Sequence, residues 1–313
     1  MTKKLPATTK PEAASQPNAG PDDRQSNAAA APGGLYPTGL YVVATPIGNL
    51  GDLSARAIAT LKAADVVACE DTRVTAVLLR RFGIATPMTA YHDHNAERVR
   101  PKLLAQLREG ATVALVSDAG TPLISDPGYK LVKECVESGI AVVPIPGPSA
   151  PLAALMAAGL PTDRFYFGGF LPQKSAARRS ALEDVKSLKA TLVFFESPHR
   201  LATTLADMAQ VLGERPAAVG REITKLHEEF KRGPLGVLAR DFGDGNVRGE
   251  IVIVVDGADE QPVAIDVEAA LRDALKTSSV RDAAETVSKL TGQPRREIYA
   301  RALAIAQAKS TDD

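Results

Sequence analysis

The sequence is poor in cysteine and contains no long apolar segment. Its two cysteines, Cys69 and Cys135, both lie in apolar stretches. Such a pair is typical of buried free thiols in a reducing compartment, and it indicates neither a disulfide framework nor a metal site. No apolar run approaches the roughly 18 residues that a membrane span needs. The N-terminal lysines are not followed by the apolar core of a secretory signal. We therefore expect a cytoplasmic protein without a membrane segment.

A net charge is also missing. The 313 residues include 37 Lys and Arg against 37 Asp and Glu, so the formal charge is zero. This balance excludes a polycation that holds nucleic acid over its whole surface, and any RNA contact must use a local basic patch. Apolar residues make up 45% of the chain, which is ample for a core. The length is that of one large domain or two ordinary ones.

The chain begins with a segment that has almost nothing to bury. Residues 1–38 are rich in Ala, Pro, Asn, Gln and charged residues. A segment of this composition cannot offset the entropy cost of ordering itself, so it is predicted to be a disordered tail.

Residues 111–128 carry the strongest local pattern. Residues 111–116 are small or β-branched apolar residues, as in a strand buried on both faces. Gly and Pro then punctuate a loop that also holds Asp118, Thr121, Ser125 and Asp126. Glycine permits close backbone approach and proline frees carbonyl groups. The loop is either a ligand site at the carboxyl edge of a parallel sheet or a solvated turn.

Two further Gly/Pro loops follow predicted strands in this part of the chain. Residues 45–52 follow a strand at residues 39–44, and residues 145–151 follow a strand at residues 140–144. The repeated order of strand, loop and helix predicts a parallel α/β domain over residues 39–150. Because the ends of parallel strands meet at one sheet edge, the three loops could converge on one ligand.

Polar clusters follow two other predicted strands. Residues 70–73, Glu-Asp-Thr-Arg, indicate either a helix N-cap with a local ion pair or a functional group. Residues 92–95, His-Asp-His-Asn, resemble a metal set, but no further Cys or His cluster completes it. Helix capping by Asp93 or Asn95 is the favoured interpretation, and contact with a phosphate or ribose is an alternative.

The rhythm changes after residue 150. Short strands with hairpin-like spacing predict a mixed α+β sheet over residues 151–257, and residues 258–313 are predicted to be a helical extension. Residues 172–180 form a basic run that is either a solvated helix face or a phosphate contact. Two predicted helices, 277–288 and 294–304, have the spacing of a helix-turn-helix unit or of a packing module. Arg295 and Arg296 at the start of the second would suit a phosphate.

Eight segments together resemble one family. They are TPIGNLGD from Thr45, CEDTR from Cys69, HDHN from His92, SDAGTPLISDPG from Ser117, PIPGPSA from Pro144, FFESPHR from Phe194, REITK from Arg221 and RGEIVIVV from Arg248. In combination they resemble the ribosomal-RNA-methylating branch of the tetrapyrrole methylase superfamily. The resemblance runs from about Leu40 to Asp256, and the helical tail is similar as well. It implies a two-domain α/β fold with a parallel first sheet, a mixed second sheet and a small helical extension.

The resemblance implies that S-adenosyl-L-methionine binds in a folded shape between the two domains. The loops and Phe195 offer backbone partners and an apolar slot for adenine, and Asp118 offers an acceptor for the ammonium group. The sulfonium needs no acid to leave, so alignment of an in-line attack is the main task. Carried over by position, the donor contacts are Thr45, Pro46, Asp118, Ala119, Gly120, Thr121, Ile124, Ser149, Ala150, Phe195 and Glu196.

The implied acceptor is the ribose 2′-hydroxyl of a cytidine in the decoding region of 16S ribosomal RNA. A base near this hydroxyl would help, and the expected candidates are Glu222, Lys225 and Asp71, with Asp93 or His94 as alternatives. The alternative role of Glu222 and Lys225 is an interdomain ion pair. Expected RNA contacts are Lys174, Arg178, Arg179, Arg221, Lys231 and Arg232. The resemblance further implies a homodimer, and no metal is expected.

Two other functions remain open at this point. Relatives in the superfamily methylate tetrapyrroles, but the basic run and the helical tail suit a polyanion better than a macrocycle. A non-catalytic RNA-binding module that keeps the same fold is the other alternative. Labelled methyl transfer to small ribosomal subunits would separate these functions.

Overall fold

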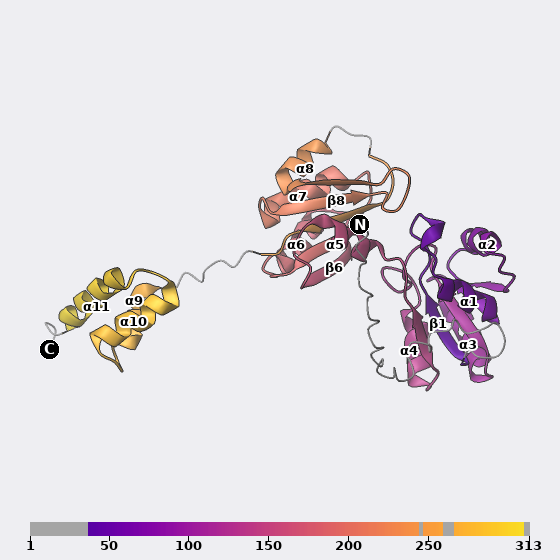
Figure 1. Ribbon diagram of the computed structural model, residues 1–313, viewed down its shortest axis with the longest axis horizontal. Coiled ribbons are helices and arrows are strands. Elements are labelled where there is room, and N and C mark those ends of the chain that lie inside the picture. Colours follow the sequence, from indigo (N-terminus) through magenta and orange to yellow (C-terminus); the bar gives the residue numbers. More distant parts are fainter. Residues whose placement is uncertain (1–36, 244–246, 259–265, 310–313) are drawn as a thin grey trace, which may run out of the picture. The chain divides into compact units, whose positions relative to one another are not determined.

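The computed structural model describes residues 37–243, 247–258 and 266–309. The predicted tail, residues 1–38, lies almost entirely outside the described residues. The chain divides into two compact units, with the boundary between Ser149 and Ala150. The prediction of an α/β fold with a parallel first sheet, a mixed second sheet and C-terminal helices is confirmed (Figure 1).

The first unit contains a five-stranded, wholly parallel sheet with the order β3-β2-β4-β1-β5. Its central strands consist of apolar residues and are buried almost throughout, because helices cover both faces of such a sheet. The strands are β1 (Gly39–Val43), β2 (Val66–Cys69), β3 (Met88–Ala90), β4 (Thr112–Val116) and β5 (Val142–Ile145). The three strands that precede the Gly/Pro loops, β4, β1 and β5, are direct neighbours.

Helices connect these strands, as the repeated pattern predicted. They are η2 (Leu50–Asp52), α1 (Ala55–Ala63), α2 (Thr72–Arg81), α3 (Ala96–Arg108) and α4 (Tyr129–Glu137). Helix α2 begins at Thr72, because Asp71 caps it by accepting a hydrogen bond from the main-chain N–H of Arg73. Ser54 caps α1 in the same way through the N–H of Ala57.

Both cysteines lie in the core of the first unit. Cys69 and Cys135 are free thiols and fully buried, as predicted from their apolar surroundings. Burial raises the pKa of the Cys135 thiol to about 11, so this thiol stays protonated at neutral pH. Burial also raises the pKa of Cys69.

The second unit contains a mixed five-stranded sheet with the order β6-β7-β10-β8-β9. Strands β6 and β7 are parallel, and the other pairs are antiparallel. The strands are β6 (Phe165–Phe170), β7 (Thr191–Glu196), β8 (Pro216–Arg221), β9 (Glu229–Pro234) and β10 (Ile251–Val255). Its α-helices before the C-terminal segment are α5 (Ala150–Ala158), α6 (Ser175–Val185), α7 (Leu201–Leu212) and α8 (Leu235–Asp241).

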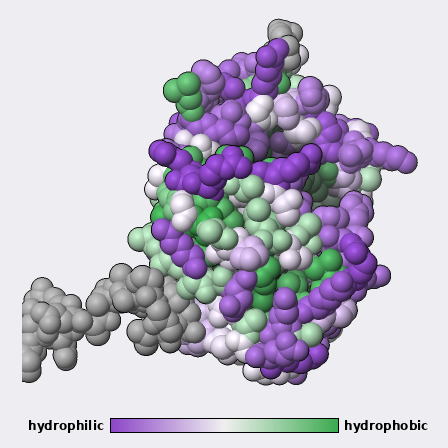
Figure 2. All heavy atoms as spheres, turned by 90° about the vertical axis from the view of Figure 1, so that its right-hand side faces the viewer, coloured by the Kyte–Doolittle hydropathy of each residue, from purple (hydrophilic) through white to green (hydrophobic). Residues whose placement is uncertain are grey.

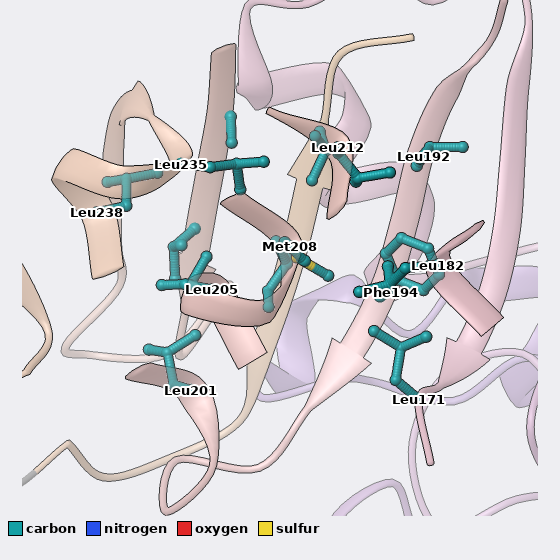
Figure 3. Packing of buried hydrophobic residues seen from close by; sticks show 14 of the residues in the cluster. Leu171, Leu182, Leu192, Phe194, Leu201, Leu205, Met208, Leu212, Leu235 and Leu238 are labelled. Atoms are coloured by element: carbon teal, nitrogen blue, oxygen red, sulfur yellow. The ribbon is translucent and has the colours of Figure 1, made fainter. Parts of the chain in front are cut away.

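A leucine-rich core holds α6, α7 and α8 against this sheet (Figure 3). Leu201, Leu205 and Met208 of α7 are fully buried and recur at the spacing of one helix face. They pack with Leu192 and Phe194 of β7. The buried face of α7 and the buried side chains of β7 therefore belong to one apolar cluster.

Three helices at the C-terminal end pack on one another (Figure 1). They are α9 (Val267–Ala274), α10 (Val280–Thr291) and α11 (Arg295–Lys309). The sequence pattern predicted α10 and α11 but did not separate α9. Gly292, in the left-handed conformation, ends α10 and allows the short turn into α11.

On the face shown in Figure 2, hydrophobic areas lie between hydrophilic side chains. Within the described residues, none of the helices combines the length and the apolar content that crossing a bilayer requires.

Candidate functional site

The three Gly/Pro loops of the first unit are joined by direct hydrogen bonds. Thr45 and Gly120 exchange main-chain hydrogen bonds of 2.8 and 3.1 Å, which tie the loop after β1 to the loop after β4. The buried hydroxyl of Thr45 also donates to the carbonyl of Ser117 at 3.1 Å. Thr121 Oγ1 donates to the carbonyl of Pro148 at 2.9 Å, which adds the loop after β5. The predicted convergence of the three loops is therefore present within the first unit.

The loop after β4 adopts an unusual backbone. Leu123 and Ser125 have φ angles of 73° and 65°, which residues other than glycine rarely adopt. Gly120 has a φ of 81°, and a Cβ there would lie 3.2 Å from the side chain of Ile47. Such conformations persist only where surrounding structure enforces them, and they cluster at ligand sites. The loop leaves Ile124 40% exposed at its apex.

Carboxylates gather at the same edge of the sheet. The N–H of Asp71, after β2, donates to Oδ1 of Asp118, after β4, at 3.0 Å. Burial, and next the charges of Asp118, Asp126 and Asp93, raise the pKa of Glu70. Burial also raises the pKa of Asp126, although a hydrogen bond with Ser117 opposes this shift. The sequence analysis singled out the cluster at residues 70–73 but named only Asp71 in it as a candidate base. The acidic surroundings of Glu70 come from separate loops and are visible only in the fold.

Asp71 itself fits the structural alternative. Its carboxylate caps α2 and forms a salt bridge with Arg73 at 2.6 Å. Hydrogen bonds from Arg73 lower the pKa of Asp71 to about 2, so it is a poor acceptor for a substrate proton. Asn95 likewise shapes its own turn, because its side chain accepts from the N–H of His92 and donates to the carbonyl of Ala90. Asn95 makes no side-chain cap on α3, unlike the prediction.

A pocket of about 230 Å³ opens beside this acidic edge. It lies between the first turns of α3 and α4 and next to the loop after β4, entirely within the first unit. Its lining consists of Tyr91, Asp93, Ala96, Glu97, Asp126, Pro127, Gly128, Tyr129 and Lys130. In the described parts of the chain, no group of three or more His, Cys, Asp or Glu side chains is arranged to hold a metal ion.

In the second unit, Phe195 presents an aromatic surface while Glu196 turns inward. The Phe195 ring packs edge-on against Phe167, with the ring centres 5.0 Å apart. Glu196 is 3% exposed. Its carboxylate accepts hydrogen bonds from Thr204 at 2.6 Å and Arg200 at 2.8 Å. The Glu196 side chain therefore has its hydrogen-bond partners within the second unit. Only the main chain of this residue is left for the expected contact with the methyl donor.

Glu222 and Lys225 form an ion pair of 2.8 Å, but both belong to the second unit, so the interdomain alternative is wrong. Glu222 also accepts from the N–H of Glu250 at 2.9 Å. Its carboxylate fills the space beside Gly249, where a Cβ would lie 2.4 Å from Glu222 Oε1. The hydrogen bond from Lys225 lowers the pKa of Glu222. Burial alone would lower the pKa of Lys225, but hydrogen bonds to Glu222 and Glu250 outweigh it and raise that pKa.

The basic run of residues 172–180 divides between the interior and the surface. Arg178 is 4% exposed and forms a salt bridge of 2.6 Å with Asp207 of α7. It also donates to the carbonyl of Gln173 at 3.1 Å. The expectation that Arg178 contacts RNA is therefore corrected, because its guanidinium is buried and paired. Lys174 is exposed, and Arg179 is partly exposed and donates to Gln210.

The other expected RNA contacts also have partners within the second unit. Arg221 pairs with Glu229 at 3.0 Å, and Lys231 lies 4.0 Å from the same carboxylate. Arg232 donates to the carbonyls of Ala157 and Ala158 at the end of α5, at 2.5 and 3.2 Å. These cations stabilise the sheet and the end of a helix, so they are less available to a phosphate than Lys174.

Comparison with protein families agrees with this fold. A model described as "Tetrapyrrole (Corrin/Porphyrin) Methylases" matches residues 39–239, and one described as "RsmI C-terminal HTH domain" matches residues 261–306. Because the first match covers more than half of the chain, the protein belongs to the tetrapyrrole methylase family and is a methyltransferase that uses S-adenosyl-L-methionine.

Particular relatives refine this class. The chain is 51% identical to ribosomal RNA small subunit methyltransferase I of Mesorhizobium japonicum, over 88% of this chain and 94% of the relative. It is 47% identical to the protein of the same name from Escherichia coli O157:H7, over 84% of this chain and 94% of the relative. Among solved structures, cobalt precorrin-4 methyltransferase shares the fold, with a TM-score of 0.53, 20% identity, and coverage of 71% and 98% of the two chains.

The first unit suits the methyl donor. Its joined loops present main-chain groups, a carboxylate at Asp118 and an exposed apolar side chain at Ile124, which match the polar, cationic and apolar parts of S-adenosyl-L-methionine. The bound donor supplies an electrophilic methyl group on a sulfonium. The residues of the chain bind and orient it.

Proposed function

We propose that the protein methylates the ribose 2′-hydroxyl of a cytidine in the decoding region of 16S ribosomal RNA. The observation that carries this proposal is the identity of 44–53% with relatives named ribosomal RNA small subunit methyltransferase I, which extends over most of the chain. The proposed donor contacts are the loop residues Thr45, Pro46, Asp118, Ala119, Gly120, Thr121, Ile124, Ser149 and Ala150, with the ring of Phe195.

In the proposed step, the 2′-oxygen attacks the methyl carbon as the carbon–sulfur bond breaks. The sulfonium leaves as a neutral thioether in S-adenosylhomocysteine, and the hydroxyl proton passes to a base. An effective base has a pKa near the working pH. Glu70 meets this need better than Asp71, Glu222 or Lys225, because burial and neighbouring carboxylates raise its pKa. The pKa shifts of the other three instead favour their charged, paired forms.

The proposed RNA contacts are exposed cations with weak or no internal partners. Lys174, which precedes α6, meets this criterion best, whereas Arg179 is partly exposed, donates to Gln210 and lies 3.9 Å from the carboxylate of Asp207. Arg296 in the first turn of α11 is exposed, whereas Arg295 pairs with Glu285 at 3.3 Å. These side chains suit a local phosphate contact on a protein without net charge. Exposed cations of this kind make a polyanion a better substrate than a tetrapyrrole.

We further propose a cytoplasmic homodimer. Two buried free thiols support a reducing compartment. Exposed apolar side chains on α5 and on the edge strand β6 support pairing of two chains, with Met156 at 84% and Phe170 at 60% exposure. Light scattering on the purified chain would measure its mass directly, and a monomeric mass would contradict the dimer.

Labelled methyl transfer tests the proposed reaction. Small ribosomal subunits from a strain that lacks this gene are incubated with the protein and labelled donor, and the RNA is digested to nucleosides. We expect the label in 2′-O-methylcytidine. Label on a base, or transfer to a precorrin but not to RNA, would contradict the proposal. Donor binding without any transfer would favour a non-catalytic RNA-binding module.

A further inference from the structure

The pocket between α3 and α4 contains none of the proposed donor contacts, yet it adjoins them. Asp126, Pro127 and Gly128 of its wall end the same loop that holds Asp118 and Thr121. A molecule in the pocket would therefore lie next to the donor loop without displacing the donor. This position is where the acceptor of the methyl group would be needed.

The size of the pocket suits one flat ring. An engineered cavity of about 150 Å³ is known to hold benzene, and this pocket has about 230 Å³. Tyr129 at its rim is 67% exposed, so the ring of this tyrosine is available for stacking. Tyr91, which also lines the pocket, is fully buried. A pocket that combines buried lining with an exposed aromatic ring has the features of a base-stacking site.

The charges of the lining select among rings. The lining contains three acidic residues, Asp93, Glu97 and Asp126, and one basic residue, Lys130. This balance repels a phosphate and favours a neutral ring that presents N–H groups. Carboxylates accept hydrogen bonds from the exocyclic amine of cytosine, whereas uracil presents a carbonyl oxygen at that position.

We propose that this pocket receives the cytosine ring of the target nucleotide, with Tyr129 stacked on the ring and the carboxylates of Asp126 and Glu97 accepting from its amine. The proposal rests on the proposed function. It assigns the recognition of the base to the first unit and leaves the phosphate contacts to the basic residues. Gly128 makes the wall possible: its φ is 132°, and a Cβ there would lie 2.8 Å from Leu115.

Matched variants test the stacking role. Tyr129→Ala removes the exposed ring, and Val136→Ala changes a residue of the same helix with a similar exposure of 64% outside the pocket. The substrate is unmethylated small subunits, and calorimetry measures donor affinity. We expect Tyr129→Ala to lower kcat/KM roughly 10- to 100-fold, with donor Kd within about twofold of the wild type. Val136→Ala should match the wild type. Equal rates for the two variants would overturn the stacking role.

A second pair tests the selection of the base. Glu97→Gln alters the pocket, and Glu109→Gln alters the residue that follows the other end of α3. Subunits with cytidine or uridine at the target position are compared. We expect Glu97→Gln and Asp126→Asn to lower the preference for cytidine roughly tenfold, and Glu109→Gln to leave it unchanged.

The outcomes separate the two proposals. If the wild-type protein transfers no methyl group to a cytidine ribose, the proposed function fails and the pocket assignment fails with it. If the wild type transfers normally and the pocket variants keep its rate and its preference for cytidine, only the pocket assignment fails. A large loss of donor affinity in Tyr129→Ala would place the donor in the pocket and would also overturn the assignment.

Discussion

The main-chain N–H of Asp71 donates a hydrogen bond of 3.0 Å to Oδ1 of Asp118. The two residues follow β2 and β4, which are neighbours in the first sheet. The same carboxylate that is proposed to meet the donor ammonium therefore also holds the start of α2. Stability and donor binding are coupled at this point, and substitution can separate them.

Asp118→Asn keeps an oxygen that can accept from Asp71 but removes the negative charge. We expect a melting temperature within about 2 °C of the wild type and donor affinity reduced roughly tenfold or more, as for the loss of a charged hydrogen-bond partner. Asp118→Ala should lower both. Calorimetry and thermal unfolding measure the two effects. Unchanged donor affinity in the asparagine variant would limit Asp118 to a role in the loop.

Thr45 tests whether the joined loops matter for binding. Thr45→Val removes the hydroxyl that donates to the carbonyl of Ser117, so this buried carbonyl loses that partner. We expect a loss of about 1–3 kcal/mol in stability and weaker donor binding. Thr45→Ser retains the donor and should recover most of both. Denaturant unfolding and donor titration provide the comparison, and a serine variant as weak as valine would contradict the role of the hydroxyl.

The buried pair of Arg178 and Asp207 has a structural role. Arg178→Ala leaves the Asp207 carboxylate with the hydroxyl of Ser175 and the more distant guanidinium of Arg179 as its partners, and we expect a loss of about 3 kcal/mol in unfolding free energy. Asp207→Ala should cost a similar amount. The double variant should lose less than the sum, because each single change already breaks the same interaction. Additive losses in urea unfolding would show that the two side chains act independently.

Lys174 precedes α6 in the same basic run, and it is exposed. Lys174→Ala should leave stability within about 0.5 kcal/mol of the wild type. It should weaken RNA binding and reduce the slope of log affinity against log salt by about 1. Filter binding at several salt concentrations measures this slope. An unchanged slope would remove Lys174 from the RNA contacts.

The acid limb of the activity profile tests Glu70. As a base, Glu70 must be ionised, so activity falls as pH drops through its pKa. Because that pKa is raised, the fall should begin at a higher pH than for an ordinary glutamate. Glu70→Gln should lower kcat roughly 10²- to 10⁴-fold and remove this limb. Asp71→Asn serves as the control that keeps the limb. A Glu70→Gln profile with the wild-type limb would exclude Glu70 as the base.

Much of the first unit follows from local pattern. The buried strands are nearly continuous apolar runs in the sequence, and each is followed by a Gly/Pro or polar segment. A parallel sheet with these segments at one edge could therefore be predicted. The helix N-cap that the cluster at residues 70–73 indicated is also present at Asp71, because N-caps depend on a few adjacent residues. The three loops meet because the strands that they follow, β4, β1 and β5, are neighbours in the sheet.

The rest depends on contacts between distant residues. Arg178 lies among exposed residues in sequence, and its burial requires Asp207, which is 29 positions away. Glu222 has a φ of 51°, and its carboxylate accepts from the N–H of Glu250, which is 28 positions away. The pocket joins the starts of two helices and one loop. No local periodicity reports such arrangements.

The two buried thiols have a practical consequence. Both Cys69 and Cys135 are inaccessible, and the raised pKa values of both disfavour the reactive thiolate. A maleimide dye should therefore not react with the unaltered chain. A single surface cysteine outside the proposed contacts, for instance Glu109→Cys, would accept one fluorophore and report how the protein approaches its substrate without removal of any natural residue from the core.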